Sequence, residues 1–292
     1  MKPPRFAYFD PVSVADAVAL KSEHGGDATV LAGGQSLVPM LNMRLASPEV
    51  LIDINGIGEL QQVSTHDGLL EFGAGVRQHV LETSKDVAAA VPLLALAVPH
   101  IGHVENRHRG TVGGSIAHAD SSAELPCVAT ALEAEVVVAG PQGTRTIAAA
   151  DFFQGWMTTS LEPEELVVGV RFPVASPRDG HGFAEVARRQ GDFAVALAGA
   201  RITLATDGSV DAVAIGLGGV ASRPLRASAA EATLVGEQPT VDAIAAAAAT
   251  VADLVTSGDD MHATRTYRQQ IAKVVVKRSL QAAVDQAKEA AR

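Results

Sequence analysis

The chain has 292 residues, 47% hydrophobic and 19% charged, so it is long enough for about two globular domains, and its composition excludes intrinsic disorder. Its 33 acidic and 23 basic side chains give a net charge of −10, which argues against nucleic acid or an anionic membrane as the main partner. The single cysteine, Cys127, excludes an internal disulfide and a cysteine-caged zinc or iron–sulfur site within the chain.

We expect neither a targeting segment nor a membrane span. Residues 1–6 lack the apolar core of a signal peptide. The most apolar stretch, 241–255, consists mostly of alanine and carries Asp242 and Asp253, so it falls short of the roughly 20 strongly apolar residues that a span needs. The sequence therefore predicts a cytoplasmic protein.

Short strands alternate with helices through residue 172 of the predicted structure. Short apolar runs next to glycines or turn residues predict the strands, which are 29–31, 50–54, 69–73, 135–139 and 166–172. Helices are expected at 37–43, 92–98 and 123–132. Pro92 suits the first turn of the second of these helices.

A composition shift at 173–182 marks the expected domain boundary, because this segment holds two prolines and two glycines. Beyond it, three runs predict an antiparallel meander at 183–188, 194–205 and 209–217, with Asp207-Gly208 as a hairpin turn. Helices are expected at 226–234, 241–255 and 264–291. Strands followed by helices indicate a C-terminal α+β domain.

Two glycine-rich segments are the candidate ligand loops. The first, 32–36 (AGGQS), lies between a predicted strand and a predicted helix, and Ser36 can cap that helix. Its glycines would let backbone N–H groups approach a phosphate, although a simple tight turn explains this segment equally well. The second, 110–115 (GTVGGS), also offers donors, and Asp120 follows it as a partner for sugar-like hydroxyls. Together they suggest one elongated diphosphate ligand held from both sides.

Neither loop matches the dinucleotide or P-loop motif, but five longer stretches identify a family. Residues 32–54 and 109–126 resemble the flavoprotein subunits of the xanthine dehydrogenase and carbon monoxide dehydrogenase group, which are FAD-binding medium subunits of molybdenum hydroxylases. The N-terminal run FAYFDPVSVADAVALK, EPEELVVGVRFP at 162–173 and ARRQGDFAVALAGA at 187–200 are similar to the same family. The resemblance spans essentially the whole chain, in order.

The resemblance implies an α+β fold. It consists of a p-cresol methylhydroxylase-type FAD-binding domain at 1–175, made of two α/β subdomains at about 1–57 and 58–175. A C-terminal α+β domain at 176–292 would follow, with a three-stranded antiparallel sheet and helices. FAD would be bound noncovalently, since Gln35 occupies the first loop and Cys127 lies in a predicted helix.

The resemblance also implies which residues bind FAD. The first loop would hold the pyrophosphate, the second loop would hold FAD from the other side, and Leu166 and Phe193 would border the flavin. The full set is Ala32, Gly33, Gly34, Gln35, Ser36, Thr111, Val112, Gly113, Gly114, Ser115, Asp120, Leu166 and Phe193. Phe193 stands where the carbon monoxide dehydrogenase relatives carry a tyrosine, so it can stack but cannot donate a hydrogen bond.

The implied function is electron transfer within an oxidoreductase complex. A large molybdopterin subunit would oxidise the substrate, and a small subunit with two 2Fe–2S clusters would pass electrons to FAD on this chain, which an external acceptor would reoxidise. The expected assembly is a dimer of heterotrimers, that is, a heterohexamer. No catalytic residue and no metal site are expected on the chain itself. NAD, a quinone, a cytochrome and oxygen all stay open as acceptors.

Two rival hypotheses are left open. One is a self-sufficient FAD-dependent oxidase or dehydrogenase of the same fold, although such enzymes usually carry a larger substrate domain. The other is a noncatalytic interaction subunit that has lost FAD, against which the two intact glycine loops argue.

Charged residues outside the loops give further expectations. Glu185 lies where many relatives have a lysine near the flavin; we expect it to point to solvent, with Arg188 or Arg189 supplying positive charge. His100, His103 and His108 match no metal-binding spacing and are expected near the flavin or at a subunit contact, whereas His118 adjoins the second loop. The basic residues Arg265, Arg268, Lys273, Lys277 and Arg278 predict a solvated face on the last helix, or a docking surface for a partner subunit.

Overall fold

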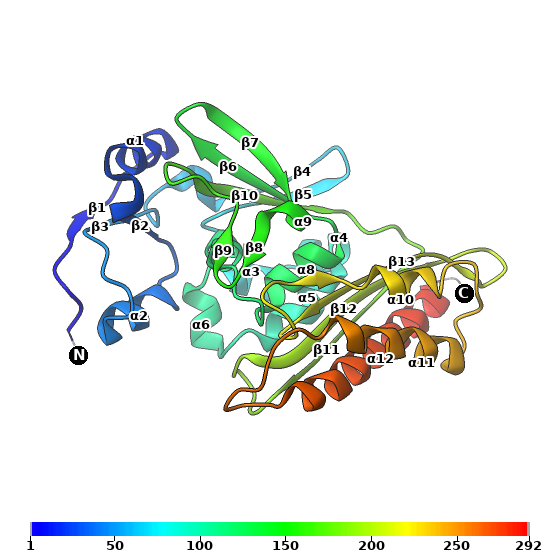
Figure 1. Cartoon of the computed structure of the whole chain (residues 1–292). Helices are drawn as coiled ribbons and strands as arrows, with labels where there is room; N and C mark the ends of the chain where they lie inside the picture. Colours follow the sequence, from blue (N-terminus) through cyan, green and yellow to red (C-terminus); the bar gives the residue numbers. More distant parts are fainter. Residues whose placement is uncertain (1, 291–292) are drawn as a thin grey trace.

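The computed structural model describes residues 2–290 and places three sheet-based parts in a row (Figure 1). The N-terminal subdomain occupies one end, a central subdomain with the largest sheet follows, and a C-terminal domain occupies the other end. Within the described residues, none of the helices combines the length and the apolarity that crossing a bilayer requires.

The N-terminal subdomain is a parallel sheet of three strands in the order β1-β3-β2. The strands are β1 (Ala7–Phe9), β2 (Ala28–Leu31) and β3 (Val50–Asp53); the helices are α1 (Val14–His24), the 3₁₀ turn η1 (Gly25–Asp27) and α2 (Leu37–Met43). The central strand β3 is an apolar run, and its first three residues are buried, as expected for a strand with neighbours on both sides. Ser13 begins α1 by accepting a hydrogen bond from the Asp16 N–H.

The central subdomain carries an antiparallel five-stranded sheet in the order β4-β5-β10-β6-β7. Its strands are β4 (Val63–His66), β5 (Leu69–Gly73), β6 (Glu135–Gly140), β7 (Gly143–Ala148) and β10 (Leu166–Pro173), with a separate hairpin of β8 (Phe153–Gly155) and β9 (Thr158–Thr159). Short helices connect these strands, and most of them lie below the sheet in the view of Figure 1. They are η2 (Gly58–Gln61), α3 (Gln78–Thr83), α4 (Lys85–Ala90), α5 (Pro92–Ala97), η3 (Val98–His100), α6 (Val104–Arg109), α7 (Val112–His118), α8 (Glu124–Ala131) and α9 (Ala149–Phe152).

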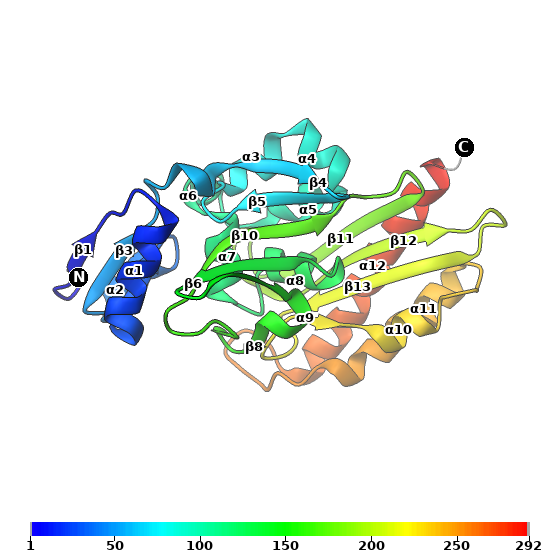
Figure 2. The same ribbon diagram turned by 90° about the horizontal axis from the view of Figure 1, so that it is seen from above.

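The C-terminal domain is an antiparallel sheet in the order β11-β12-β13-β14. Its elements are β11 (Asp179–Ala187), β12 (Ala194–Leu204), β13 (Val210–Gly218), β14 (Leu225–Arg226), α10 (Ser228–Ala232), α11 (Val241–Thr250), η4 (Val251–Leu254) and α12 (Arg265–Ala290). The long helix α12 runs along one face of this sheet (Figure 2).

Two features of this domain differ from the sequence prediction. The fourth strand, β14, extends the predicted three-stranded sheet, and its pairing with β13 shortens the helix expected at 226–234. Strand β11 begins at Asp179, inside the segment expected to be a linker. Gly180 and Gly182 contributed to the predicted domain boundary. In the structure, a Cβ on either glycine would collide with the α12 backbone, so these glycines let the helix lie directly on the strand. The end of the last predicted helix, residue 291, lies outside the described residues.

Candidate functional site

A cleft of about 870 Å³ is lined by segments from all three parts of the chain. Both glycine-rich segments contribute to it, as do residues between 157 and 167, from the β8–β9 hairpin into β10, and residues 191–193 of the C-terminal domain. This volume lies within the roughly 300–1,000 Å³ that small-molecule and cofactor sites occupy. The cleft is therefore large enough for an elongated ligand.

The first glycine-rich segment presents unpaired donors to this cleft. Within the described residues, the backbone N–H groups of residues 33–37 donate to no protein acceptor. Gly34 adopts a left-handed conformation with φ of +73°, and a Cβ on Gly33 would lie 2.7 Å from the Cα of Gly110. Only glycine fits both positions. These five consecutive donors are unpaired within the described residues, and the oxygens of a phosphate group can accept hydrogen bonds from them.

The second glycine-rich segment differs from the prediction, because it is the first turn of α7 rather than a loop with free donors. The N–H groups of residues 112–115 are all paired, at 2.9–3.1 Å, with oxygens of Val76, Ala74 and Thr111. Gly113 is required for packing, since its Cβ would lie 2.6 Å from the Cα of Ala74. This segment therefore forms a wall of the cleft with its surface atoms and side chains, not with a ring of N–H groups.

The structure brings all but one of the predicted binding residues together. Those that line the cleft are Ala32, Gly33, Gly34, Gln35, Ser36, Thr111, Gly113, Gly114, Ser115, Asp120, Leu166 and Phe193. Val112 is the exception: its side chain is fully buried in the hydrophobic core and does not reach the cleft. Cys127 is also fully buried and absent from the cleft lining, so it offers no attachment point for a ligand.

Several residues that line the cleft belong to no sequence motif, so their place in the site could not be predicted. Lys21 is buried beneath the cleft, where its ammonium donates to the carbonyls of Gly25 and Ala28, each at 3.0 Å. Burial lowers the pKa of Lys21. Leu161 and Thr159 reach the cleft only because the strand pair β8–β9 folds the chain back toward it.

Glu124 places a carboxyl at the cleft that favours the protonated form. Its side chain lies at the start of α8, and burial, with the nearby charge of Asp120, raises its pKa to about 7. No sequence pattern distinguished Glu124 from an ordinary first-turn glutamate. Both carboxyls line the same cleft.

Glu185 does not point to solvent, and that prediction was wrong. Its side chain is only 5% exposed, its Oε2 has no hydrogen-bond partner among the described residues, and His100 Nδ1 lies 3.9 Å away. Burial, with the charge of Glu124, raises the pKa of Glu185 to about 8. The alternation of β11 turns this side chain inward, against the Phe183–His100 contact.

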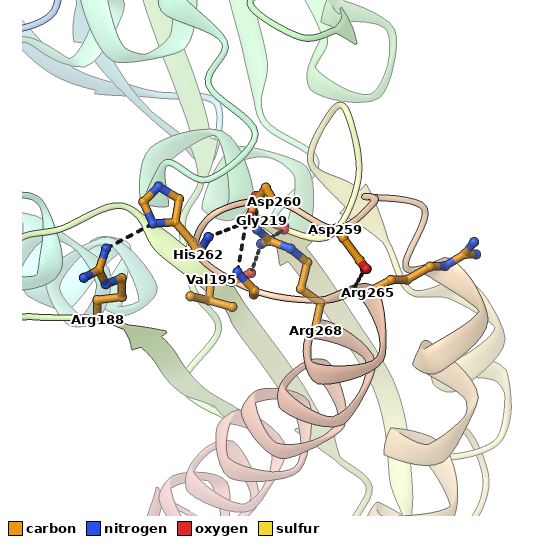
Figure 3. Close-up of polar contacts among 9 residues, drawn as sticks. Arg188, Val195, Gly219, Asp259, Asp260, His262, Arg265 and Arg268 are labelled. Atoms are coloured by element: carbon orange, nitrogen blue, oxygen red, sulfur yellow. Dashed lines mark hydrogen bonds and ion pairs between the residues drawn. The ribbon is translucent and has the colours of Figure 1, made fainter.

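Phe193 stands at the rim of the cleft with 65% of its surface exposed. The start of β12, directly after it, is anchored by the buried guanidinium of Arg268, which donates to the carbonyls of Val195 and Gly219 at 2.8 and 3.0 Å (Figure 3). Arg268 also pairs with Asp260. This arginine therefore departs from the solvated face predicted for the last helix, because it is buried and anchors the start of the strand that follows Phe193.

The predicted histidines separate into different environments. His118 lines the cleft at the end of α7. A Cβ on Gly191 would lie 2.9 Å from the His103 ring, so His103 packs near the Phe193 end of the cleft. His108 stacks on His79, with ring centroids 4.4 Å apart. Within residues 2–290, no three histidine, cysteine or acidic side chains gather closely enough to hold a metal ion.

The cleft fits a flavin dinucleotide in three respects. Free N–H groups at residues 33–37 suit a diphosphate, the carboxyl of Asp120 suits ligand hydroxyls, and Leu166, Leu161 and Phe193 supply apolar surface for a planar ring.

Comparisons with known proteins agree with this geometry. Residues 4–175 match the family described as the FAD binding domain in molybdopterin dehydrogenase, and residues 181–283 match the CO dehydrogenase flavoprotein C-terminal domain. The chain is 37% identical to subunit alpha of the 6-hydroxypseudooxynicotine dehydrogenase complex of Paenarthrobacter nicotinovorans, over 99% of this chain and 97% of the relative. It is 38% identical to the carbon monoxide dehydrogenase medium chain of Hydrogenophaga pseudoflava, over 97% and 98% of the two chains.

Solved structures show the same fold. Carbon monoxide dehydrogenase from Hydrogenophaga pseudoflava superimposes with a TM-score of 0.95 at 40% identity, covering 98% of this chain and 99% of that chain. Quinoline 2-oxidoreductase from Pseudomonas putida 86 gives a TM-score of 0.93 at 34% identity, covering both chains completely.

Proposed function

The chain belongs to the family of FAD-binding medium subunits of molybdenum hydroxylases, and from this premise we propose that it passes electrons from 2Fe–2S clusters on a partner subunit to an external acceptor. The observation that carries this proposal is the run of five unpaired N–H groups at residues 33–37, which opens into a cleft large enough for FAD. When bound, FAD supplies the redox chemistry, because its ring system accepts and releases electrons.

The residues of the chain would bind and orient this cofactor. We assign the N–H groups of residues 33–37 to the diphosphate, and Asp120 to hydroxyls of the sugar-like part. Thr111, Ser115 and the Gly113–Gly114 surface would enclose the ligand from the α7 side. Leu166 and Phe193 would contact the flavin ring, and Phe193, at the exposed rim of the cleft, would lie on the side from which an acceptor could approach.

The chain needs partners to perform this work, because its only cysteine is buried and cannot hold an iron–sulfur cluster. We propose a large molybdopterin subunit, a small 2Fe–2S subunit and a dimer of heterotrimers, with the cytoplasm as the location. Domain limits near residues 57 and 175 fit the ends of the three sheets.

Removing FAD from the purified complex tests the electron-transfer role. We expect the substrate of the complex still to bleach the iron–sulfur absorbance of the FAD-depleted complex, while reduction of the external acceptor falls at least tenfold and returns when FAD is added. Stopped-flow absorbance and steady-state assays measure the two steps. Unchanged acceptor reduction without FAD would show that electrons leave by another route.

A further inference from the structure

Arg77 joins two segments that lie on either side of the first glycine-rich loop. It precedes α3 in the central subdomain, and its Nη2 donates to the Oδ1 of Asn55, which follows β3 in the N-terminal subdomain, at 2.7 Å. Its Nη1 donates to the carbonyl of Arg109. One guanidinium therefore holds the chain just before the second glycine-rich segment and the end of the N-terminal sheet together.

Asn55 carries this connection to the first loop. Its Nδ2 donates to the carbonyl of Ala32 at 2.7 Å, directly before the glycines. The side chain of Asn55 is held in turn by Asp53 Oδ1, at 2.6 Å from Nδ2, and Asp53 Oδ2 accepts a hydrogen bond from the Tyr8 hydroxyl at 2.7 Å. Apart from Arg77, the groups that hold the Asn55 side chain thus come from the N-terminal subdomain.

The loop enclosed by these bonds has no room to shift toward its neighbour. The backbone of Gly33 lies against Arg109 and Gly110 so closely that a Cβ would collide there. On the other side of the loop, Asn106 Nδ2 donates to Gln35 Oε1 at 3.0 Å. The first loop is therefore held against the residues that precede the second segment, by bonds on both sides of its glycines.

The geometry points to a clasp, formed by Arg77 and Asn55, that holds the N–H groups of residues 33–37 in their binding geometry against the second segment. Neither side chain lines the cleft, so both are positioning residues that act through Ala32 and Arg109. The inference rests on the proposed FAD site and adds to it how side chains of two subdomains align the two glycine-rich segments as one binding surface. Donors that are fixed before the ligand arrives bind it more tightly, because the loop loses less conformational entropy on binding.

A double-mutant cycle separates this role from a contribution to stability. Arg77→Lys keeps the positive charge but cannot span both acceptors, and Asn55→Ala removes the other half of the clasp. We expect each single variant of the full chain to bind FAD about tenfold more weakly than the parent chain. The double variant should bind no more weakly than the single variant with the lower affinity, because both side chains act through one connection. Fluorescence titration with FAD measures the Kd.

Arg171→Lys is the matched control, because Arg171 also bridges two partners, Glu71 at 2.7 Å and Glu135 at 3.6 Å, but lies in the central sheet outside the cleft. We expect it to change the free energy of unfolding and leave the FAD Kd unchanged. Additive losses in the cycle, or an equal loss of affinity in Arg171→Lys, would overturn the clasp.

A second readout needs no flavin. In the ligand-free chain, Arg77→Lys should speed amide hydrogen exchange in the peptide covering residues 108–115, where the N–H groups of residues 110 and 112–115 are hydrogen-bonded, relative to both the parent chain and Arg171→Lys. Unchanged exchange overturns the clasp whatever the affinities show. A parent chain that binds no FAD would instead overturn the proposed function, so the two failures are distinguishable.

Discussion

Replacing Ser36 with aspartate is expected to weaken FAD binding about a thousandfold. Ser36 lies among the unpaired N–H groups of residues 33–37, and its hydroxyl caps nothing in α2, so its loss leaves no protein group unpaired. The new carboxylate would itself accept hydrogen bonds from these N–H groups, and its negative charge would repel the diphosphate. A like charge about 4 Å away costs about 4 kcal/mol near a protein surface, which corresponds to a thousandfold in affinity. Fluorescence titration of the full chain measures the change.

Ser84→Asp is the matched control for this charge. Ser84 accepts a hydrogen bond from the Val87 N–H at the start of α4, outside the cleft, and aspartate caps a helix equally well. We expect it to bind FAD as the parent chain does. A Ser36→Asp chain that retains stoichiometric FAD would show that the diphosphate does not lie at this loop.

Replacing Glu185 with glutamine is expected to stabilise the protein above pH 6. The pKa of this carboxyl is about 8 in the folded state against an ordinary value of 4.5, so the folded state binds the proton more tightly. Its stabilising effect is complete at low pH and is lost as the pH rises from 4.5 to about 8. The loss is about 1 kcal/mol per pH unit in this window, and glutamine avoids it because it stays neutral. At pH 7.5 the Tm should rise by roughly 5 °C.

Thermal unfolding at several pH values measures this effect. Glu124 keeps a pKa of about 7 and stays in the variant, so the pH dependence should become shallower rather than disappear. Glu237→Gln, at an exposed position in the C-terminal domain, is expected to leave the pH dependence unchanged. A Glu185→Gln chain with the pH dependence of the parent would mean that Glu185 is ionised in the folded protein.

Strong local patterns predicted the elements that position the site. The strand before the first loop and the helix after it appear as β2 and α2, because an apolar run followed by glycines is specified within a few residues. The hairpin at Asp207-Gly208 also matches, since Gly208 adopts φ of +83°, which the turn requires. The resemblance to the flavoprotein subunits, confirmed by the comparisons, supplied the family and its cofactor, which no single loop could identify.

Features that depend on tertiary contacts could not be predicted from the sequence. The N–H groups of the second glycine-rich segment donate hydrogen bonds to oxygens of Ala74, Val76 and Thr111, and the local sequence GTVGGS does not indicate that these acceptors lie nearby. Glu185 appeared to be a solvent-facing glutamate, but the register of β11 turns it inward. Gly180 was predicted to lie at a domain boundary, whereas it lies within β11 and permits close contact with a helix about a hundred residues away. No local sequence pattern indicates such a contact.

The flavin content of the natively purified complex tests the central claim most directly. Its absorbance spectrum should show flavin and iron–sulfur bands, and two other chains should purify with this one. Acid should release one free FAD per copy of this chain, since the chain carries one cleft of this size with unpaired N–H groups among the described residues, and Cys127 is buried away from it. A complex with iron–sulfur absorbance and no flavin on this chain would contradict the account.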